Sequence, residues 1–280
     1  MVSRTNFRRR RYLALAARYL VLTVMAVIVV FPLYIVFLDA LLSVKDITST
    51  PPVLFSWHLH WGVFATAWRV AGLGRALVNS LLQTGLTVTG QLVTSILAAF
   101  AFAFLDFPLK RTLYVLTLAT LMIPFEVTLI TNLQTVTSLG LFGNLGGLVV
   151  PFLATGFGIF LLRAAFEQIP KEMREAAVID GYSNLRFMRR VAVPMARPSI
   201  AALAVFTFLA AWNSYLWPAI VTSSNPTWRT LQIQIQSIGS TPSDANLQIA
   251  AAAIAVFPLL LLLIFFQKQL IRSLSAGAVK

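Results

Sequence analysis

Long apolar runs alternate with short charged segments along this chain. Five nearly uncharged stretches stand out: Tyr19–Leu38, Ala76–Leu105, Thr112–Leu162, Pro198–Trp228 and Ala245–Gln267. A membrane-spanning helix takes about 20 apolar residues, so the third stretch is long enough for two spans. Its polar and glycine-rich part, Thr131–Gly147, marks the break between them. The pattern predicts an all-α, polytopic membrane protein with six transmembrane helices.

The lysines and arginines are divided unevenly between the segments that join these runs. If the N-terminus is inside, 18 of the 22 basic residues lie in inner segments. Because basic residues accumulate on the cytoplasmic side of a membrane, both termini are predicted to be cytoplasmic. Three parts follow: a basic cytoplasmic N-terminus at 1–18, a six-helix transmembrane domain at 19–267 with a cytoplasmic loop at 163–197, and a cytoplasmic tail at 268–280.

The N-terminal run and the two outer segments each allow a further prediction. A cleaved signal peptide is the alternative at the N-terminus, but the first run is long for one, and Phe37–Ala40 is a poor cleavage site. The outer segments Leu41–Arg75 and Pro218–Asp244 are rich in proline or in small polar residues. We expect both to be loops with little regular structure.

Composition narrows the class of protein. Hydrophobic residues make up 58% of the chain and charged residues 11%, too few for the surface of a soluble domain. The net charge of +13 comes from residues that flank apolar runs, which indicates contact with membrane lipid and not with nucleic acid. No GxxxxGK[ST] phosphate loop and no GxSxG motif occurs, there is no cysteine, and His58 and His60 have no nearby carboxylate. We therefore expect no catalytic residues, no metal site and no membrane enzyme.

The segment between the fourth and fifth spans carries the strongest local signals. Pro170 suits the first position of a helix, and Glu172 and Glu175 lie in its early turns, where the helix dipole favours negative charge. Gly181 can adopt the left-handed conformation that ends a helix. Ser183 can cap a following helix. The sequence predicts two short helices joined by a turn.

Two interpretations of this segment remain open from composition. A cytoplasmic helical segment can lie on anionic headgroups, or it can dock into a cleft of another protein. Between Glu167 and Arg190 there are four acidic and five basic residues, so the segment is not simply basic. The small side chains of Ala176 and Ala177 would permit close approach to a protein surface.

The residues of this segment resemble a known family. Glu175-Ala176-Ala177, three residues, Gly181, nine residues and Val191-Ala192-Val193-Pro194 resemble the EAA loop of ABC importer permeases. Val191 and Val193 stand where that pattern has Ile and Leu. Further likeness to the carbohydrate-uptake, maltose-permease-like branch lies in Phe160–Arg163, Ile169–Glu172, Ala211–Pro218 and Leu274–Lys280, although the last lacks the branch's final glycine. The resemblance runs from about Met122 to the C-terminus.

The resemblance implies a permease subunit that forms half of the translocation pathway for a sugar or related small polar solute. A coupling helix at Glu172–Asp180 would dock on a cytoplasmic ATPase. The coupling residues it implies are Glu172, Glu175, Ala176, Ala177, Asp180, Gly181 and Pro194, and the residues of an ATPase-contacting tail are Ser275, Ala276, Gly277 and Lys280.

The same resemblance implies partners and a location. The partners are a second homologous permease, two cytoplasmic ATP-binding subunits and an extracytoplasmic solute-binding protein. The ATP-binding subunits would hold ATP and magnesium, so this chain itself would carry no cofactor. The location is the inner membrane of a bacterial or archaeal cell.

Polar residues recur inside the second span. Asn79, Gln83, Thr87, Gln91 and Ser95 lie four residues apart and form one stripe on a helix. Because polar groups are costly in lipid, the stripe is expected to face the interior of the bundle. It can serve helix–helix packing, aided by the small residues Gly85 and Gly90, or it can line the pathway.

Three further polar residues are pathway candidates. Glu126 follows Pro124, a predicted kink, and is the one acid inside a span. Asn213 and Tyr215, with Trp217, can form a hydrogen-bonding aromatic ledge or an ordinary interfacial belt. An alternative function is a self-contained secondary transporter or channel, which would need its own coupling-ion site. Glu126 alone gives little support to that alternative.

Overall fold

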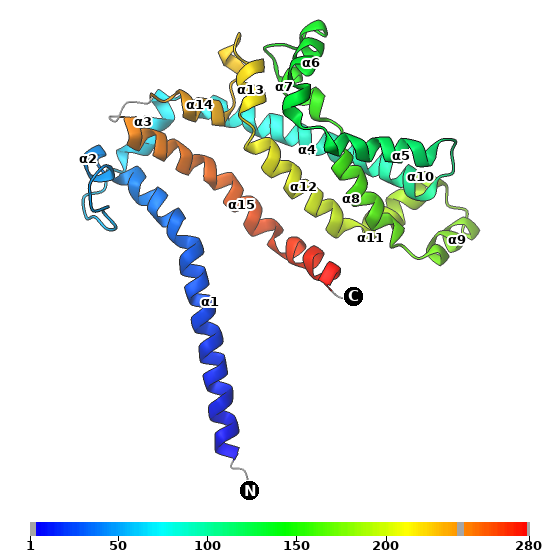
Figure 1. The fold of residues 1–280 in the computed structure, drawn as a ribbon, viewed down its shortest axis with the longest axis horizontal. Helices are drawn as coiled ribbons and strands as arrows, with labels where there is room; N and C mark the ends of the chain where they lie inside the picture. Colours follow the sequence, from blue (N-terminus) through cyan, green and yellow to red (C-terminus); the bar gives the residue numbers. More distant parts are fainter. Residues whose placement is uncertain (1–3, 240–243, 279–280) are drawn as a thin grey trace. The chain divides into compact units, whose positions relative to one another are not determined.

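The chain divides into two compact, helical units. The computed structural model describes the backbone of residues 4–239 and 244–278, and the side chains of 14–239 and 244–267. One unit consists of Met1–Ala71 with Ile238–Ile254, and the other of Gly72–Ser237 with Ala255–Lys280. No strand occurs in the described part of the chain (Figure 1). The prediction of an all-α fold is confirmed.

The first unit is built from few helices. They are α1 (Arg4–Leu41), α2 (Val44–Ile47), α3 (Gly62–Val70) and the first turns of α15 (Ala245–Ala278). The second unit holds the rest of α15 and a longer series of shorter helices. These are α4 (Leu73–Phe104), α5 (Lys110–Ala119), η1 (Thr120–Met122), α6 (Phe125–Ser138), α7 (Leu145–Val149), η2 (Val150–Phe152), α8 (Gly156–Glu167), α9 (Lys171–Ile179), α10 (Asn184–Phe187), η3 (Met188–Ala192), α11 (Val193–Met195), α12 (Arg197–Trp212), α13 (Leu216–Val221), η4 (Pro226–Trp228) and α14 (Leu231–Ser237).

Three helices in the described residues are long and apolar enough to cross a membrane: Ala14–Leu41, Leu73–Phe104 and Ala245–Gln267. Three bent pairs pass the same test together: Lys110–Met122 with Phe125–Ser138, Leu145–Phe152 with Gly156–Glu167, and Asn184–Met195 with Arg197–Trp212. If each bent pair forms one broken span, the described residues contain six. This is the number that the apolar pattern predicts.

The structure keeps one detail of the predicted layout and corrects another. Within the Thr112–Leu162 stretch, α6 ends at Ser138 and α7 begins at Leu145, so the gap between the two bent pairs lies inside the predicted break at Thr131–Gly147. The sharpest bend, 104°, lies earlier, at Ile123–Pro124. Pro124 has no N–H to continue the helix, so the predicted kink is confirmed at this residue. The two outer segments are more regular than expected, since they contain α3 and α14.

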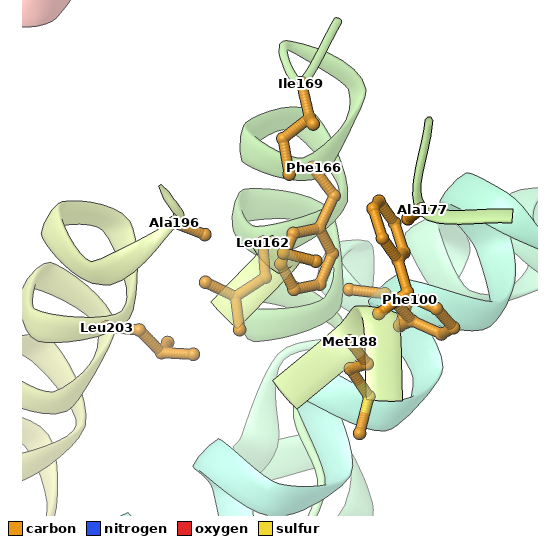
Figure 2. Packing of buried hydrophobic residues seen from close by; sticks show 11 residues of the cluster. Phe100, Leu162, Phe166, Ile169, Ala177, Met188, Ala196 and Leu203 are labelled. Carbon is orange, nitrogen blue, oxygen red and sulfur yellow. The ribbon is translucent and has the colours of Figure 1, made fainter. Parts of the chain in front are cut away.

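The core of the second unit forms where α4 packs against α8 and α12. Figure 2 shows the buried side chains that meet there from α4, α8, α9 and the segment between α10 and α12. Four phenylalanine rings pack together in this cluster, which we call the aromatic cluster. The ring centroids of Phe100 and Phe104 lie 6.3 and 6.0 Å from that of Phe166, and the centroid of Phe187 lies 5.3 Å from that of Phe104. Aromatic pairs at these distances stabilise beyond their buried area. This aromatic cluster fixes the C-terminal end of α4.

A second cluster surrounds Trp217 of α13. Its indole is almost fully buried and donates a hydrogen bond to the carbonyl oxygen of Gly147, 3.0 Å away. Phe125 and Phe152 both meet the indole edge to face, with centroids 5.9 Å away. A Cβ on Gly147 would lie only 2.3 Å from the backbone oxygen of Leu141, so glycine is required for this close approach.

Substituting Gly147→Ala should therefore destabilise the fold. We expect the free energy of unfolding to fall by about 1–3 kcal/mol, the usual cost of overpacking. Gly85→Ala is the matched control, because a Cβ there would meet nothing within 4 Å. Thermal unfolding of the detergent-solubilised chain measures both, and equal melting temperatures for the two variants would contradict the close contact.

Candidate functional site

The predicted helix–turn–helix between the fourth and fifth spans is present. Helix α9 begins at Lys171, directly after Pro170, and Gly181 has a φ of 71°. The Gly181 N–H donates to the carbonyl of Val178 at 3.0 Å, and the Tyr182 N–H to that of Ala177 at 2.8 Å. These bonds satisfy carbonyls at the helix end, so the predicted role of Gly181 as a C-terminal cap is confirmed.

Helix α9 buries one side and exposes the other. Ala177 is buried in the aromatic cluster (Figure 2), whereas Glu172, Glu175, Ala176, Asp180 and Gly181 are exposed. Two apolar residues at its end are also exposed: Val178 at 64% and Ile179 at 86%. Apolar side chains this exposed beside carboxylates are typical of a surface that another molecule covers. We call these seven exposed residues the α9 outer face.

Arg174 holds α9 against α4. Its Nη1 donates a hydrogen bond to the carbonyl oxygen of Phe104, the last residue of α4. Its guanidinium lies 5.4 Å from the centre of the Phe104 ring, in cation–π geometry. The charged donor thus satisfies a carbonyl that the helix end leaves free. Arg174 was not predicted, because its partner lies 70 residues away in the sequence.

A hollow of about 670 Å³ lies beside α9. It is bounded by the ends of α4 and α8 and by Lys171, Glu175, Val178 and Ile179 of α9. Most of its wall is apolar, and the exposed Glu175 is one of its lining residues. The hollow therefore extends the α9 outer face inward, toward the aromatic cluster.

The second helix of the turn leads into α12. Ser183 caps it as predicted, accepting a hydrogen bond from the Arg186 N–H at 3.4 Å. Phe187 and Met188 are buried in the aromatic cluster. Pro194 is half-buried in α11, and the chain bends by 77° before α12 begins. The segment is thus fixed to the core at several points.

The polar stripe on α4 faces the interior of its unit. Asn79, Gln83, Thr87 and Ser95 are buried, and Gln91 is half-buried. The Asn79 amide donates to the carbonyls of Thr227 and Arg229, at 2.8 and 2.9 Å. These are packing contacts of the predicted kind. A Cβ at Gly90 would meet Leu153, whereas one at Gly85 would meet nothing within 4 Å among the described residues, so no other helix of this chain packs on Gly85 there.

The other pathway candidates are exposed, unlike the residues of the stripe. Glu126 is exposed in the first turn of α6. Asn213 and Tyr215 are exposed, with the Asn213 amide bonded to the Leu209 carbonyl at 2.9 Å, while Trp217 is buried. A shared ledge of all three is therefore not present. Lys280 and the side chains of Ser275, Ala276 and Gly277 lie outside the described residues.

Comparison with known proteins identifies similar chains. Residues 91–276 match the family described as binding-protein-dependent transport system inner membrane component. The sn-glycerol-3-phosphate transport system permease protein UgpE of Yersinia pestis bv. Antiqua is 31% identical over 91% of this chain and 94% of its own length. The same-named protein of Brucella abortus is 32% identical with the same coverage.

Two solved structures share the fold. A chain of a bacterial ABC transporter involved in the import of the acidic polysaccharide alginate matches with a TM-score of 0.77 at 20% identity, over 96% of this chain and 98% of that chain. A chain of the bacterial alginate ABC transporter in complex with its alginate pentasaccharide-bound periplasmic protein matches with a TM-score of 0.63 at 16% identity, covering 92% and 93%.

The Arg174 contact can be tested by hydrogen exchange. In Arg174→Ala we expect the backbone amides of α9 to exchange roughly tenfold faster, because a charged hydrogen bond holding the helix is lost. Lys171→Ala is the control, since Lys171 is an exposed cation of the same helix with no hydrogen bond in the described residues. Mass spectrometry of α9 peptides gives the rates, and unchanged exchange in both variants would show that Arg174 does not anchor α9.

Proposed function

The chain belongs to the family of binding-protein-dependent transport system inner membrane components, and on this premise we propose that it is one permease subunit of an ATP-driven importer for a sugar or related small polar solute. The relatives with a known assignment are named for sn-glycerol 3-phosphate, and the similar structures come from an importer of alginate. Both compounds are rich in hydroxyl groups, which supports a polyhydroxylated solute here.

The observation that carries the proposal is the α9 outer face. A short helix, capped by Gly181 and backed by the core, exposes Glu175, Val178 and Ile179 beside a hollow. We infer that a cytoplasmic ATPase subunit covers this face. Ala176 permits close approach, Val178 and Ile179 supply apolar contact, and the carboxylates of Glu172, Glu175 and Asp180 supply polar contacts.

The contacts of α9 suggest how movement passes into the membrane. Ala177 is buried in the aromatic cluster, and Arg174 binds the end of α4. A displacement of α9 by the ATPase therefore acts directly on α4, which carries the polar stripe. ATP binding would shift the population between inward-open and outward-open states through such differential contacts. Pro194 would keep the second helix of the turn in place.

The rest of the proposed assembly lies outside this chain. A second homologous permease completes the pathway, two ATP-binding subunits hold ATP and magnesium, and an extracytoplasmic binding protein delivers the solute. The distribution of basic residues supports cytoplasmic termini. In this arrangement the tail residues Ser275, Ala276, Gly277 and Lys280 contact the ATPases. Glu126, Asn213 and Tyr215 remain candidates for the pathway.

A self-contained secondary transporter or channel was the alternative, and the family match does not favour it. A permease subunit of an ATP-driven importer binds an ATP-hydrolysing subunit, whereas a self-contained transporter or channel needs none. Purification of the chain in mild detergent should bring with it a soluble ATP-hydrolysing subunit under the proposal. Purification of an active transporter without any such subunit would favour the alternative.

Reversing a charge on the α9 outer face should uncouple the importer. In Glu175→Lys, we expect solute uptake and transport-stimulated ATP hydrolysis to fall at least tenfold, roughly the cost of one unfavourable charge in an interface. Gly181→Pro should act likewise, because proline cannot adopt the positive φ of this cap. Membrane insertion should persist in both.

Asp106→Lys is the matched control for Glu175→Lys. It makes the same change of charge at an exposed carboxylate outside α9, whose contact with Lys110 is a loose 3.9 Å. Uptake and ATP hydrolysis should stay near the wild-type level. Normal uptake in both Glu175→Lys and Gly181→Pro would refute coupling through α9.

A further inference from the structure

Four of the five residues in the polar stripe of α4 divide into two kinds. Asn79 and Gln91 have their amides occupied: Asn79 by two carbonyls, and Gln91 by the Phe152 carbonyl at 2.9 Å and the Thr207 hydroxyl at 2.9 Å. Gln83 and Thr87 lie between these two residues, one turn apart. In the part of the chain that the structure describes, the Thr87 hydroxyl is fully buried without a hydrogen-bond partner, and the Gln83 amide makes no side-chain hydrogen bond either. They are nevertheless only 3% and 4% exposed.

These two residues lie on the wall of a hollow of about 140 Å³. The hollow is bounded by α4, by Phe152 of η2 and by α12 with the residues that follow it. Beside Gln83 and Thr87, its polar lining comes from Gln91, Thr207 and Ser214. Among the residues that the structure describes, none that borders it is charged.

A buried polar group without a partner is costly, by about 1–3 kcal/mol. Folded proteins satisfy such groups with protein or with water, and lipid offers neither. An unpartnered amide and hydroxyl on the wall of a hollow therefore indicate a partner that enters the hollow. Amides and hydroxyls both donate and accept hydrogen bonds, which matches the hydroxyl groups of a polyol. An ionised group would find no opposite charge there.

We propose that Gln83 and Thr87 bind hydroxyl groups of the solute in transit, so that this subunit contacts the solute directly. The inference rests on the proposed function and names the chemistry of its pathway. The hollow has room for about five water molecules at roughly 30 Å³ each, so it accepts a hydroxylated part of the solute and not a whole oligosaccharide. Asn79 and Gln91, above and below in the stripe, hold the surrounding backbone in place.

The absence of cysteine from this chain allows a direct test. Ser214→Cys places one thiol on the wall of the hollow without altering Gln83 or Thr87. The assembled importer, in lipid nanodiscs, is treated with a small methanethiosulfonate reagent, both nucleotide-free and with ATP bound. Mass spectrometry of this chain gives the labelling rate. Glycerol serves as the minimal polyol, and tert-butanol, of similar size with one hydroxyl, as its control.

We expect glycerol to slow labelling several-fold and tert-butanol not to. Adding Gln83→Leu or Thr87→Val should abolish the protection by glycerol. Thr84→Val is the matched control and should keep it, because Thr84 is also buried with an unpartnered hydroxyl but does not border the hollow.

Three results would overturn the proposal. The first is that Ser214→Cys is not labelled in either nucleotide state, and the second is that glycerol and tert-butanol slow its labelling equally. The third is that glycerol protects the thiol equally in the Thr84→Val and Thr87→Val variants. If this test of polyol binding fails but Glu175→Lys still abolishes uptake, the polyol site is refuted and the proposed function is not. Conversely, protection by glycerol together with normal uptake in Glu175→Lys would refute coupling through α9 but keep the polyol site.

Discussion

The packing of aromatic rings at the end of α4 is the interaction on which the rest of this structure depends. Phe100 and Phe104 bring that end against Phe166 of α8 and Phe187 of α10. Ala177 of α9 is buried in the same cluster (Figure 2). Without this cluster α9, a helix of nine residues, would have little to hold it, since helices this short are marginal alone. Arg174 adds a polar contact at the same place.

Helix α4 connects two distant regions, the α9 outer face and the hollow beside Gln83 and Thr87. From Phe104 to Gln83 is 21 residues, or about 30 Å along a helix. No proline interrupts this part of α4, so a displacement at its end is not absorbed by a kink. The α9 outer face and the hollow beside Gln83 and Thr87 are therefore connected by one continuous element, and an importer would need such a connection between its motor and its pathway.

Sequence reasoning succeeded where the signal is local. Gly181 ends α9 and Ser183 caps α10 because each acts through its own backbone and immediate neighbours. The 104° bend at Pro124 was predicted for the same reason. Sequence reasoning failed at α3 and α14, whose short helices lie in segments that composition assigned to loops. There the buried Val63, Ala67, Leu231 and Ile235 show that packing overrode the weak local preference.

The sequence by itself determined the class of fold, the apolar runs that make six spans possible, and the four-residue spacing of the polar stripe, because hydropathy and helical periodicity are properties of neighbouring residues. It could not distinguish Asn79 and Gln91 from Gln83 and Thr87, since all four have the same place in the pattern. Only the tertiary structure decided that the first pair bonds to backbone carbonyls, whereas the second pair borders a hollow. The physical reason is that hydrogen-bond partners 61 to 150 residues away are set by packing and leave no mark on local spacing.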